Sequence, residues 1–192
     1  MIGPYRIEGY VIASADGMIA DASGAMPPGL EHDADKRYFA EALDHVAAVV
    51  HGRRSQEIQP KSPSRRRLIL TRGVDALARH PDNPRALFWN PAGAPFGEAC
   101  AALGIVSGTI AIIGGPKVYS LFLKLGYDAF HLCRAVNVRL PDGLPAFVRD
   151  LFDGEPDACL KGAGLRAAGT RPLSDEVSLT DWTRRAEATR PG

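Results

Sequence analysis

The stretch Ile113-Gly114-Gly115-Pro116-Lys117-Val118-Tyr119 decides the fold class, because it joins a short apolar run to a segment with helical spacing. Residues 109–113 are apolar and rich in β-branched side chains, which is typical of a buried strand. Two glycines at such a junction let a ligand approach the backbone, and the N-terminus of the following helix offers unpaired N–H groups to a phosphate. The junction therefore predicts an α/β fold with a phosphate site. A tight turn alone would also explain the glycines, and the pattern is not the G-x-G-x-x-G fingerprint.

Two other apolar runs end in the same kind of sequence. Residues 46–51 lead into Gly52-Arg53-Arg54-Ser55, which we expect to open a short helix, and residues 66–71 end at Leu70-Thr71-Arg72-Gly73. Guanidinium and hydroxyl groups bind phosphate well, and open α/β sheets place ligands beyond the carboxyl ends of parallel strands. If the three strands are neighbours, their ends form one groove for an anion. Solvent-exposed arginines are the simpler alternative at each junction taken alone.

Strand-like and helix-like segments alternate over most of the chain, and this order indicates a mainly parallel sheet covered by helices. The rhythm changes after about residue 141, where 159–168 and 176–183 are predicted as an antiparallel pair of strands. We expect one domain over residues 1–185 and a polar tail over residues 186–192. The proline-broken stretch 75–95 is the hardest to assign. The remaining expected strands are 5–13, 86–89 and 127–138, and the expected helices are 33–45, 95–103 and 117–125.

Charge and composition exclude several classes of protein. The 192 residues carry 23 basic and 22 acidic side chains, for a net charge of +1, which argues against a nucleic-acid binder or a protein that binds anionic membranes. No apolar run approaches the roughly 20 residues that a membrane-spanning helix needs. Three cysteines without a C-x-x-C pair disfavour a disulfide framework or a zinc site, and the five histidines form no metal-binding pattern. We therefore expect a cytoplasmic protein without a metal.

The basic residues are nearly all arginine, 18 of the 23. Codon bias in a G+C-rich genome would explain most of them. Six, however, fall within 20 residues and overlap two of the junctions above: Arg53, Arg54, Arg65, Arg66, Arg67 and Arg72. We therefore predict a local cationic groove suited to a small anionic cofactor rather than to a polymer.

Asp33 is the candidate acid. It follows a loop rich in Gly and Pro and begins an amphipathic helix. A carboxylate in an apolar cleft has a raised pKa and can hold a proton for a heteroaromatic ring that is being reduced. Asp35 and Glu31 are alternatives, and all three could simply stabilise the helix N-terminus.

Four motifs, which come in the expected order along the chain, resemble those of a known superfamily. Ser14-Ala15-Asp16-Gly17-Met18-Ile19-Ala20 resembles the S-x-D-G-x-I-A signature of the reductase domain of bacterial riboflavin biosynthesis and its stand-alone relatives. Gly52-Arg53-Arg54-Ser55 and the stretch 113–119 resemble the G-R-x-T/S and I-G-G-x-x-V/I-Y turns of the dihydrofolate reductase-like superfamily. Met26-Pro27-x-x-Leu30-x-x-Asp33 resembles the M-P-x-x-L-x-x-D stretch of dihydrofolate reductases.

The resemblance implies a dihydrofolate reductase-like α/β fold: a twisted, mainly parallel sheet with flanking helices and a C-terminal antiparallel hairpin. It implies NADPH as the hydride donor, with Asp33 as the acid of the substrate ring. Arg53, Arg54 and Ser55 would hold phosphates, and Thr71 and Arg72 would surround the 2′-phosphate. The other implied cofactor-binding residues are Ala13, Ile19, Ile113, Gly114, Gly115, Pro116, Lys117, Val118 and Tyr119.

The substrate implied is a pterin, pyrimidine or related heteroaromatic ring. Pro28 replaces a tryptophan that many dihydrofolate reductases have, whereas residues 65–67 lie where those enzymes grip a glutamate tail. The chain starts at its first strand, without the deaminase domain of the riboflavin pathway, so we expect a stand-alone paralogue that forms a homodimer through its C-terminal strands. A catalytically silent nucleotide-binding or assembly module, or a binder of another phosphorylated ligand, are the alternatives.

Overall fold

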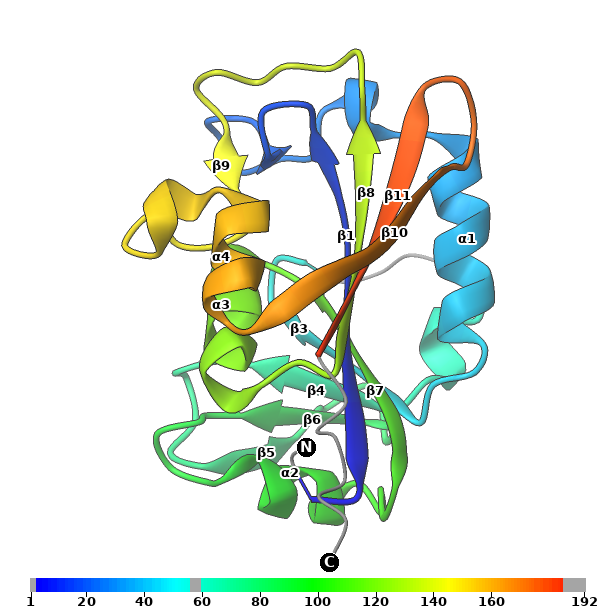
Figure 1. Ribbon diagram of the computed structural model, residues 1–192. Helices are drawn as coiled ribbons and strands as arrows, with labels where there is room; N and C mark the ends of the chain where they lie inside the picture. Colours follow the sequence, from blue (N-terminus) through cyan, green and yellow to red (C-terminus); the bar gives the residue numbers. More distant parts are fainter. Residues whose placement is uncertain (1–2, 56–59, 185–192) are drawn as a thin grey trace, which may run out of the picture.

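The structure is a computed structural model that describes residues 3–55 and 60–184 (Figure 1). Its main sheet has the order β10-β11-β8-β1-β7-β3-β4-β6-β5, and β2 and β9 form a separate pair. The strands are β1 (Tyr5–Ser14), β2 (Met18–Ala20), β3 (Ala48–Gly52), β4 (Arg67–Leu70), β5 (Leu77–Arg79), β6 (Ala86–Trp89), β7 (Gly108–Gly114), β8 (Ala129–Ala135), β9 (Leu144–Pro145), β10 (Leu165–Pro172) and β11 (Val177–Arg184). The helices are α1 (Asp33–Leu43), α2 (Phe96–Ala102), α3 (Pro116–Leu125) and α4 (Pro156–Gly162).

The centre of the sheet is parallel, as predicted. Strands β8, β1, β7, β3, β4 and β6 run in one direction, while β5 at one edge and β11 and β10 at the other are antiparallel to their neighbours. We call the side of the sheet where the six parallel strands end the carboxyl edge, and the side where they begin the amino edge. The three glycine and arginine junctions follow β7, β3 and β4, which are adjacent, so all three lie at the carboxyl edge.

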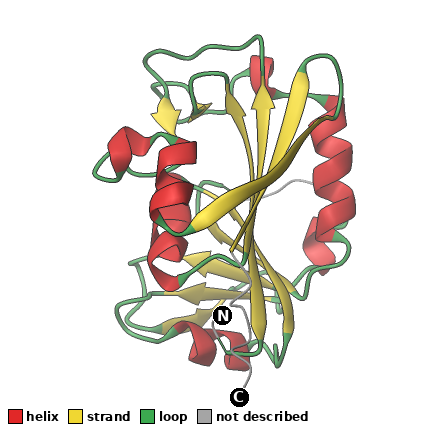
Figure 2. Cartoon of the chain, in the orientation of Figure 1, coloured by secondary structure: helices red, strands yellow, loops and turns green. Residues whose placement is uncertain are grey.

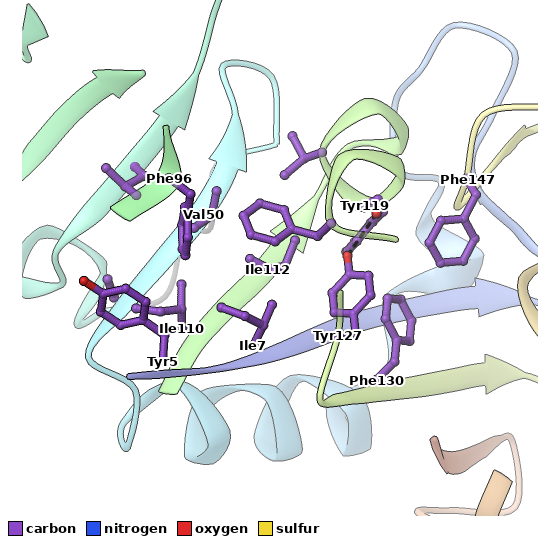
Figure 3. Close-up of a cluster of buried hydrophobic side chains, with 14 of the residues drawn as sticks. Tyr5, Ile7, Val50, Phe96, Ile110, Ile112, Tyr119, Tyr127, Phe130 and Phe147 are labelled. Atoms are coloured by element: carbon purple, nitrogen blue, oxygen red, sulfur yellow. Dashed lines mark hydrogen bonds between the residues drawn. The ribbon is translucent and has the colours of Figure 1, made fainter. Parts of the chain in front are cut away.

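Helices cover both faces of the sheet (Figures 1 and 2). Alternate residues of β1 point to opposite faces, because side chains of a strand alternate with a period of two. Ile7 belongs to the larger core, where α2, α3 and α4 pack, and Tyr10 belongs to a smaller core under α1. Aromatic side chains fill the larger core, among them Tyr119 and Phe130 (Figure 3). Residues of α3 that follow the glycine junction are therefore anchored by deep burial.

Strands β1 and β7 separate toward the carboxyl edge. Their pairing ends at Gly9 and Ile112, after which β1 continues alongside β8 and β7 continues alongside β3. Tyr119 of α3 lies at this separation, and its hydroxyl donates a hydrogen bond of 2.6 Å to the backbone carbonyl of Tyr10. The sheet is therefore open between its two central strands at the edge where ligands bind in such folds.

One predicted strand is partly a helix. Residues 156–162 form α4, which overlaps the first residues of the expected strand 159–168, and β10 begins only at Leu165. Glu155 caps α4 by accepting hydrogen bonds from the backbone N–H groups of Asp157 and Ala158, and Pro156 fits the first turn. This capping pattern outweighs the apolar residues that suggested a strand. The antiparallel pair itself is confirmed, since β10 pairs with β11.

Other expectations are refined. The stretch 75–95 contains the antiparallel strands β5 and β6. Residues 53 and 54 form a turn, and the remainder of the short helix expected there falls on residues 56–59, outside the described residues, as does the predicted tail 186–192. Within the described residues, every helix is too short or too polar to cross a membrane.

Candidate active site

A cavity of about 420 Å³ opens at the carboxyl edge, where β1 and β7 separate. The N-terminus of α3 and the turn after β3 form one end of its wall, through residues such as Gly115 and Ser55. Helix α1 and strand β8 contribute Asp35 and His131, and the loop after β2 contributes Met26. One continuous cavity thus connects a helix N-terminus with a partly buried carboxyl group.

The glycine junction is a close-fitting backbone turn. Gly114 has a φ of 141° and Gly115, the N-cap of α3, has a φ of 69°, conformations that residues with a side chain rarely adopt. A Cβ atom added to Gly115 would lie 3.0 Å from Ser55 Oγ, and one added to Gly114 would lie 3.2 Å from Ser55 Cβ. Pro116 has no N–H and Val118 donates to the Gly115 carbonyl at 2.9 Å, so the donors left in the first turn of α3 are the backbone N–H of Lys117 and, across the turn, the Ser55 hydroxyl. This donor set suits a phosphate group.

The predicted cofactor-binding residues divide into two groups. Those that line the cavity are Ile19, Arg54, Ser55, Ile113, Gly114, Gly115, Pro116 and Tyr119. Those outside its lining are Ala13 and Val118, which are buried in the larger core, and Arg53, Thr71, Arg72 and Lys117. Thr71 and Arg72 follow β4, which is separated from β7 by β3, so they lie farther along the same edge. The roles of this second group stay predictions.

The two aspartates at the start of α1 differ in position. Asp33 is the first residue of the helix and is exposed, whereas Asp35 lines the cavity together with Tyr38 and Phe39. Residues two positions apart on a helix point in nearly opposite directions, so both carboxyl groups cannot face one cavity. The geometry therefore favours Asp35, the alternative that the sequence left open, while the role of Asp33 stays a prediction.

Asp35 has the electrostatic character expected of an acid. Burial raises its pKa, and a hydrogen bond with the Cys133 thiol and the charges of His32 and Lys36 oppose that shift without cancelling it. Glu31, the other alternative, also lines the cavity, but it is exposed and forms an ion pair of 2.9 Å with Lys36. Asp35 is thus the carboxyl group best able to hold a proton inside the cavity.

Sequence reasoning missed a charged cluster that reaches the cavity wall through His131. His131 of β8 stacks on Tyr10, with ring centroids 4.7 Å apart, and its Nδ1 lies 2.6 Å from a carboxylate oxygen of Asp181. Its Nε2 lies 3.7 Å from Oε2 of Glu8. Burial lowers the pKa of His131, but the two carboxylates outweigh burial and raise it. Burial likewise raises the pKa of Glu8, but the nearby His131 and the hydrogen bonds that Tyr10 and Arg6 donate lower it to about 2.

The arginines at 65–67 lie away from the cavity. They precede or begin β4, so they are at the amino edge, opposite the turn at Arg54. Arg67 is buried and donates hydrogen bonds to the backbone carbonyl of Ser62, and Arg65 forms an ion pair of 3.0 Å with Asp44. The prediction of a single cationic groove is therefore wrong: Arg53, Arg54 and Arg72 are at the carboxyl edge and the other three are not. Residues at 65–67 cannot grip the tail of a substrate in this cavity.

No family model and no curated protein matches this sequence. Solved structures do match it. A pyrimidine reductase-like protein from Corynebacterium diphtheriae is 16% identical with a TM-score of 0.65, and the alignment covers 93% of this chain and 91% of that one. Dihydrofolate reductase from Enterococcus faecalis, solved with NADP(H), is 15% identical with a TM-score of 0.59, over 94% and 97% of the two chains.

A two-domain protein gives a similar result. The deaminase and 5-amino-6-(5-phosphoribosylamino)uracil reductase from Thermotoga maritima is 16% identical with a TM-score of 0.61. The alignment covers 93% of this chain but only 56% of that one. At these identities the likeness concerns the fold, and it agrees with the sheet order and the C-terminal antiparallel strands described above. The chain has the dihydrofolate reductase-like fold that its four motifs predicted.

Proposed function

We propose that the protein is an NADPH-dependent reductase that acts on a pterin, pyrimidine or related heteroaromatic ring. One observation carries the proposal: a single cavity at the carboxyl edge joins the phosphate-suited N-terminus of α3 to the partly buried carboxyl group of Asp35. A binding site for a phosphorylated cofactor and a proton-holding group would therefore share one cavity. The fold likeness to reductases supports the same conclusion.

The residues at one end of the cavity fit the cofactor. Gly114 and Gly115 expose backbone that a side chain would cover, and Arg54 and Ser55 add a cation and a hydroxyl beside them. These groups would hold the diphosphate of NADPH, because N–H groups, guanidinium and hydroxyl all donate to phosphate oxygens. NADPH, when bound, supplies the hydride. Thr71 and Arg72, farther along the edge, would bind the 2′-phosphate.

The residues at the other end fit a flat, polar ring. Tyr38 and Phe39 present aromatic surface from α1 beside Asp35. Aromatic walls favour stacking of a heteroaromatic substrate, and a carboxyl group with a raised pKa can donate a hydrogen bond or a proton to a ring nitrogen. Asp35 would thus orient the ring and keep a proton available at its carboxyl oxygen. Most of the catalysis would come from holding the two reactants side by side.

Turnover is the direct test. Purified protein is mixed with NADPH and, in turn, a dihydropterin, dihydrofolate and a ribosylaminopyrimidine phosphate, and the loss of NADPH absorbance is followed. We expect oxidation with at least one ring class and a clear preference for NADPH over NADH, which Arg72→Ala removes and Arg166→Ala, at an exposed position on β10, leaves intact. Binding of NADPH without oxidation by any ring would instead favour a catalytically silent nucleotide-binding module. No binding of either nucleotide at millimolar concentration would overturn the proposal.

A further inference from the structure

Two cavities at the amino edge are lined by the arginines that the candidate active site does not use. The first, of about 360 Å³, lies beside the end of α1 and the start of β4. The second, of about 420 Å³, lies beside the start of β6 and the end of α2. Both are lined by Arg66 and Arg85, so these two side chains stand between the cavities.

The sheet itself places these arginines together. Strands β4 and β6 are parallel neighbours, and Arg67 pairs with Ala86 in the register, so Arg66 and Arg85 enter the two strands side by side. The backbone N–H of Arg67 donates to the carbonyl of Arg85 at 2.9 Å, which fixes this alignment. Arg79 of the adjacent β5 pairs with Leu87 and also lines the second cavity. Their side chains are exposed, and their charges on neighbouring strands add to one local positive potential that an anion would lower.

The charge of these cavities is not balanced by the described part of the chain. Asp44 is the single carboxylate in the wall of the first cavity, and it is already engaged by Lys61 and Arg65. The second cavity has no acidic residue in its described wall. Within the described residues, 3–55 and 60–184, no hydrogen bond or ion pair involves the guanidinium groups of Arg66, Arg79 or Arg85. A chain with a net charge of only +1 thus gathers at one place three guanidinium groups that the described residues leave without an acidic partner.

We propose that this edge is a second anion-binding site, which takes a small molecule carrying a diphosphate or two closely spaced phosphate groups. Three guanidinium groups can donate to several phosphate oxygens at once, which is the geometry in which arginine binds phosphate best. The cavity walls next to them are aliphatic, with Leu43 in the first cavity and Leu103 in the second, so an apolar portion of the ligand also finds a surface. A small ligand fits better than a nucleic acid, because the cationic surface is concave and local rather than extended.

The test measures binding of inorganic pyrophosphate by calorimetry to the full chain at fixed ionic strength. Because pyrophosphate can also enter the candidate active site, each variant is compared with Arg54→Ala. We expect Arg66→Ala combined with Arg85→Ala to weaken one class of pyrophosphate binding by more than about tenfold, the loss of roughly one charge-assisted interaction or more. Arg54→Ala and the exposed control Arg166→Ala should leave that class unchanged.

Thermal unfolding gives a second readout that does not depend on the reductase proposal. Pyrophosphate should raise the melting temperature of the wild type and of Arg54→Ala, and it should do so much less for the Arg66→Ala, Arg85→Ala double variant. Folding of the double variant is checked by circular dichroism, since both positions are exposed. Pyrophosphate binding that disappears with Arg54→Ala alone, or no binding at millimolar concentration, would overturn the second site. Binding of duplex DNA or RNA in preference to pyrophosphate through the same arginines would overturn the small-molecule assignment.

Discussion

The hydroxyl of Tyr119 supports the separation between β1 and β7, and its removal is a sharp test of that role. Tyr119→Phe keeps the ring contacts with Phe130 and Phe147, at centroid distances of 5.8 and 6.1 Å, and deletes only the hydrogen bond to the Tyr10 carbonyl. Tyr119 is only 2% exposed, so the abandoned carbonyl has little access to water. A buried polar group that loses its partner costs about 1–3 kcal/mol. For a chain of this length each kcal/mol lowers the melting temperature by roughly 2–4 °C, so we expect a loss of about 2–12 °C.

The matched control is Tyr127→Phe. The Tyr127 hydroxyl donates a hydrogen bond of 3.1 Å to the backbone carbonyl of Tyr119, in the same core but outside the cavity wall (Figure 3). Calorimetric unfolding and NADPH titration are performed on both variants. Both should lose stability, and only Tyr119→Phe should weaken NADPH binding, by about tenfold or less, because only its hydroxyl lies where β1 and β7 part. Equal NADPH affinity in Tyr119→Phe and wild type, or an equal loss in both variants, would refute this reasoning.

Three other predictions concern charge and backbone. Asp35→Asn should lower kcat by about 10²–10⁴-fold while Asp33→Asn does not. Because the folded-state pKa of Asp35 is raised, the variant should also be more stable than wild type near pH 7, and this difference fades as pH falls through the folded-state pKa toward about 4. Equal kcat values of the Asp35→Asn and Asp33→Asn variants would contradict Asp35 as the acid. The pKa of Glu8 is lowered to about 2, so its stabilising effect is present above pH 4.5 and lost as pH falls toward 2; Glu8→Gln should flatten that acid limb in pH-dependent unfolding. The pKa of His131 is raised, so its contribution to the free energy of unfolding is complete below about pH 6.5 and is lost as pH rises through the folded-state value. An unfolding pH profile of Glu8→Gln identical to that of wild type would contradict the interaction between Glu8 and His131. Gly115→Ala should cost about 1–2 kcal/mol at φ 69° and weaken NADPH binding, and a variant as stable as wild type would argue against the strained turn.

The sequence predicted the parts of the site that depend on local pattern. The junctions after β3, β4 and β7 each combine an apolar run with a turn, and a parallel order necessarily brings their ends to one edge. The resemblance of the junctions after β3 and β7 to family motifs added the expectation that both hold phosphates of one cofactor. The structure shows that Gly115 and Ser55 are in close approach, which is what the two motifs together implied.

Features that depend on helix phase or strand order could not be predicted. Asp33 and Asp35 differ by two positions, and only the direction in which α1 packs decides which one faces the cavity. The contact between His131 and Asp181, which are 50 positions apart in the sequence, requires β8 and β11 to be neighbours. The arginines at 65–67 are close in sequence to Arg54, but they precede a strand rather than follow one, which sends them to the other edge.

An NMR titration of the isotope-labelled protein with NADPH, which follows the backbone amides, tests directly whether the carboxyl edge binds the cofactor. We expect strong chemical-shift changes for the amides of Gly114, Gly115 and Lys117, at the start of α3, together with that of Ser55. The amides of Arg66 and Arg85, at the amino edge, should shift only at higher NADPH concentration, because that edge can hold the diphosphate but not the rest of the cofactor. Shifts confined to the amino edge, or no shift at millimolar NADPH, would contradict the assignment of the carboxyl edge as the cofactor site.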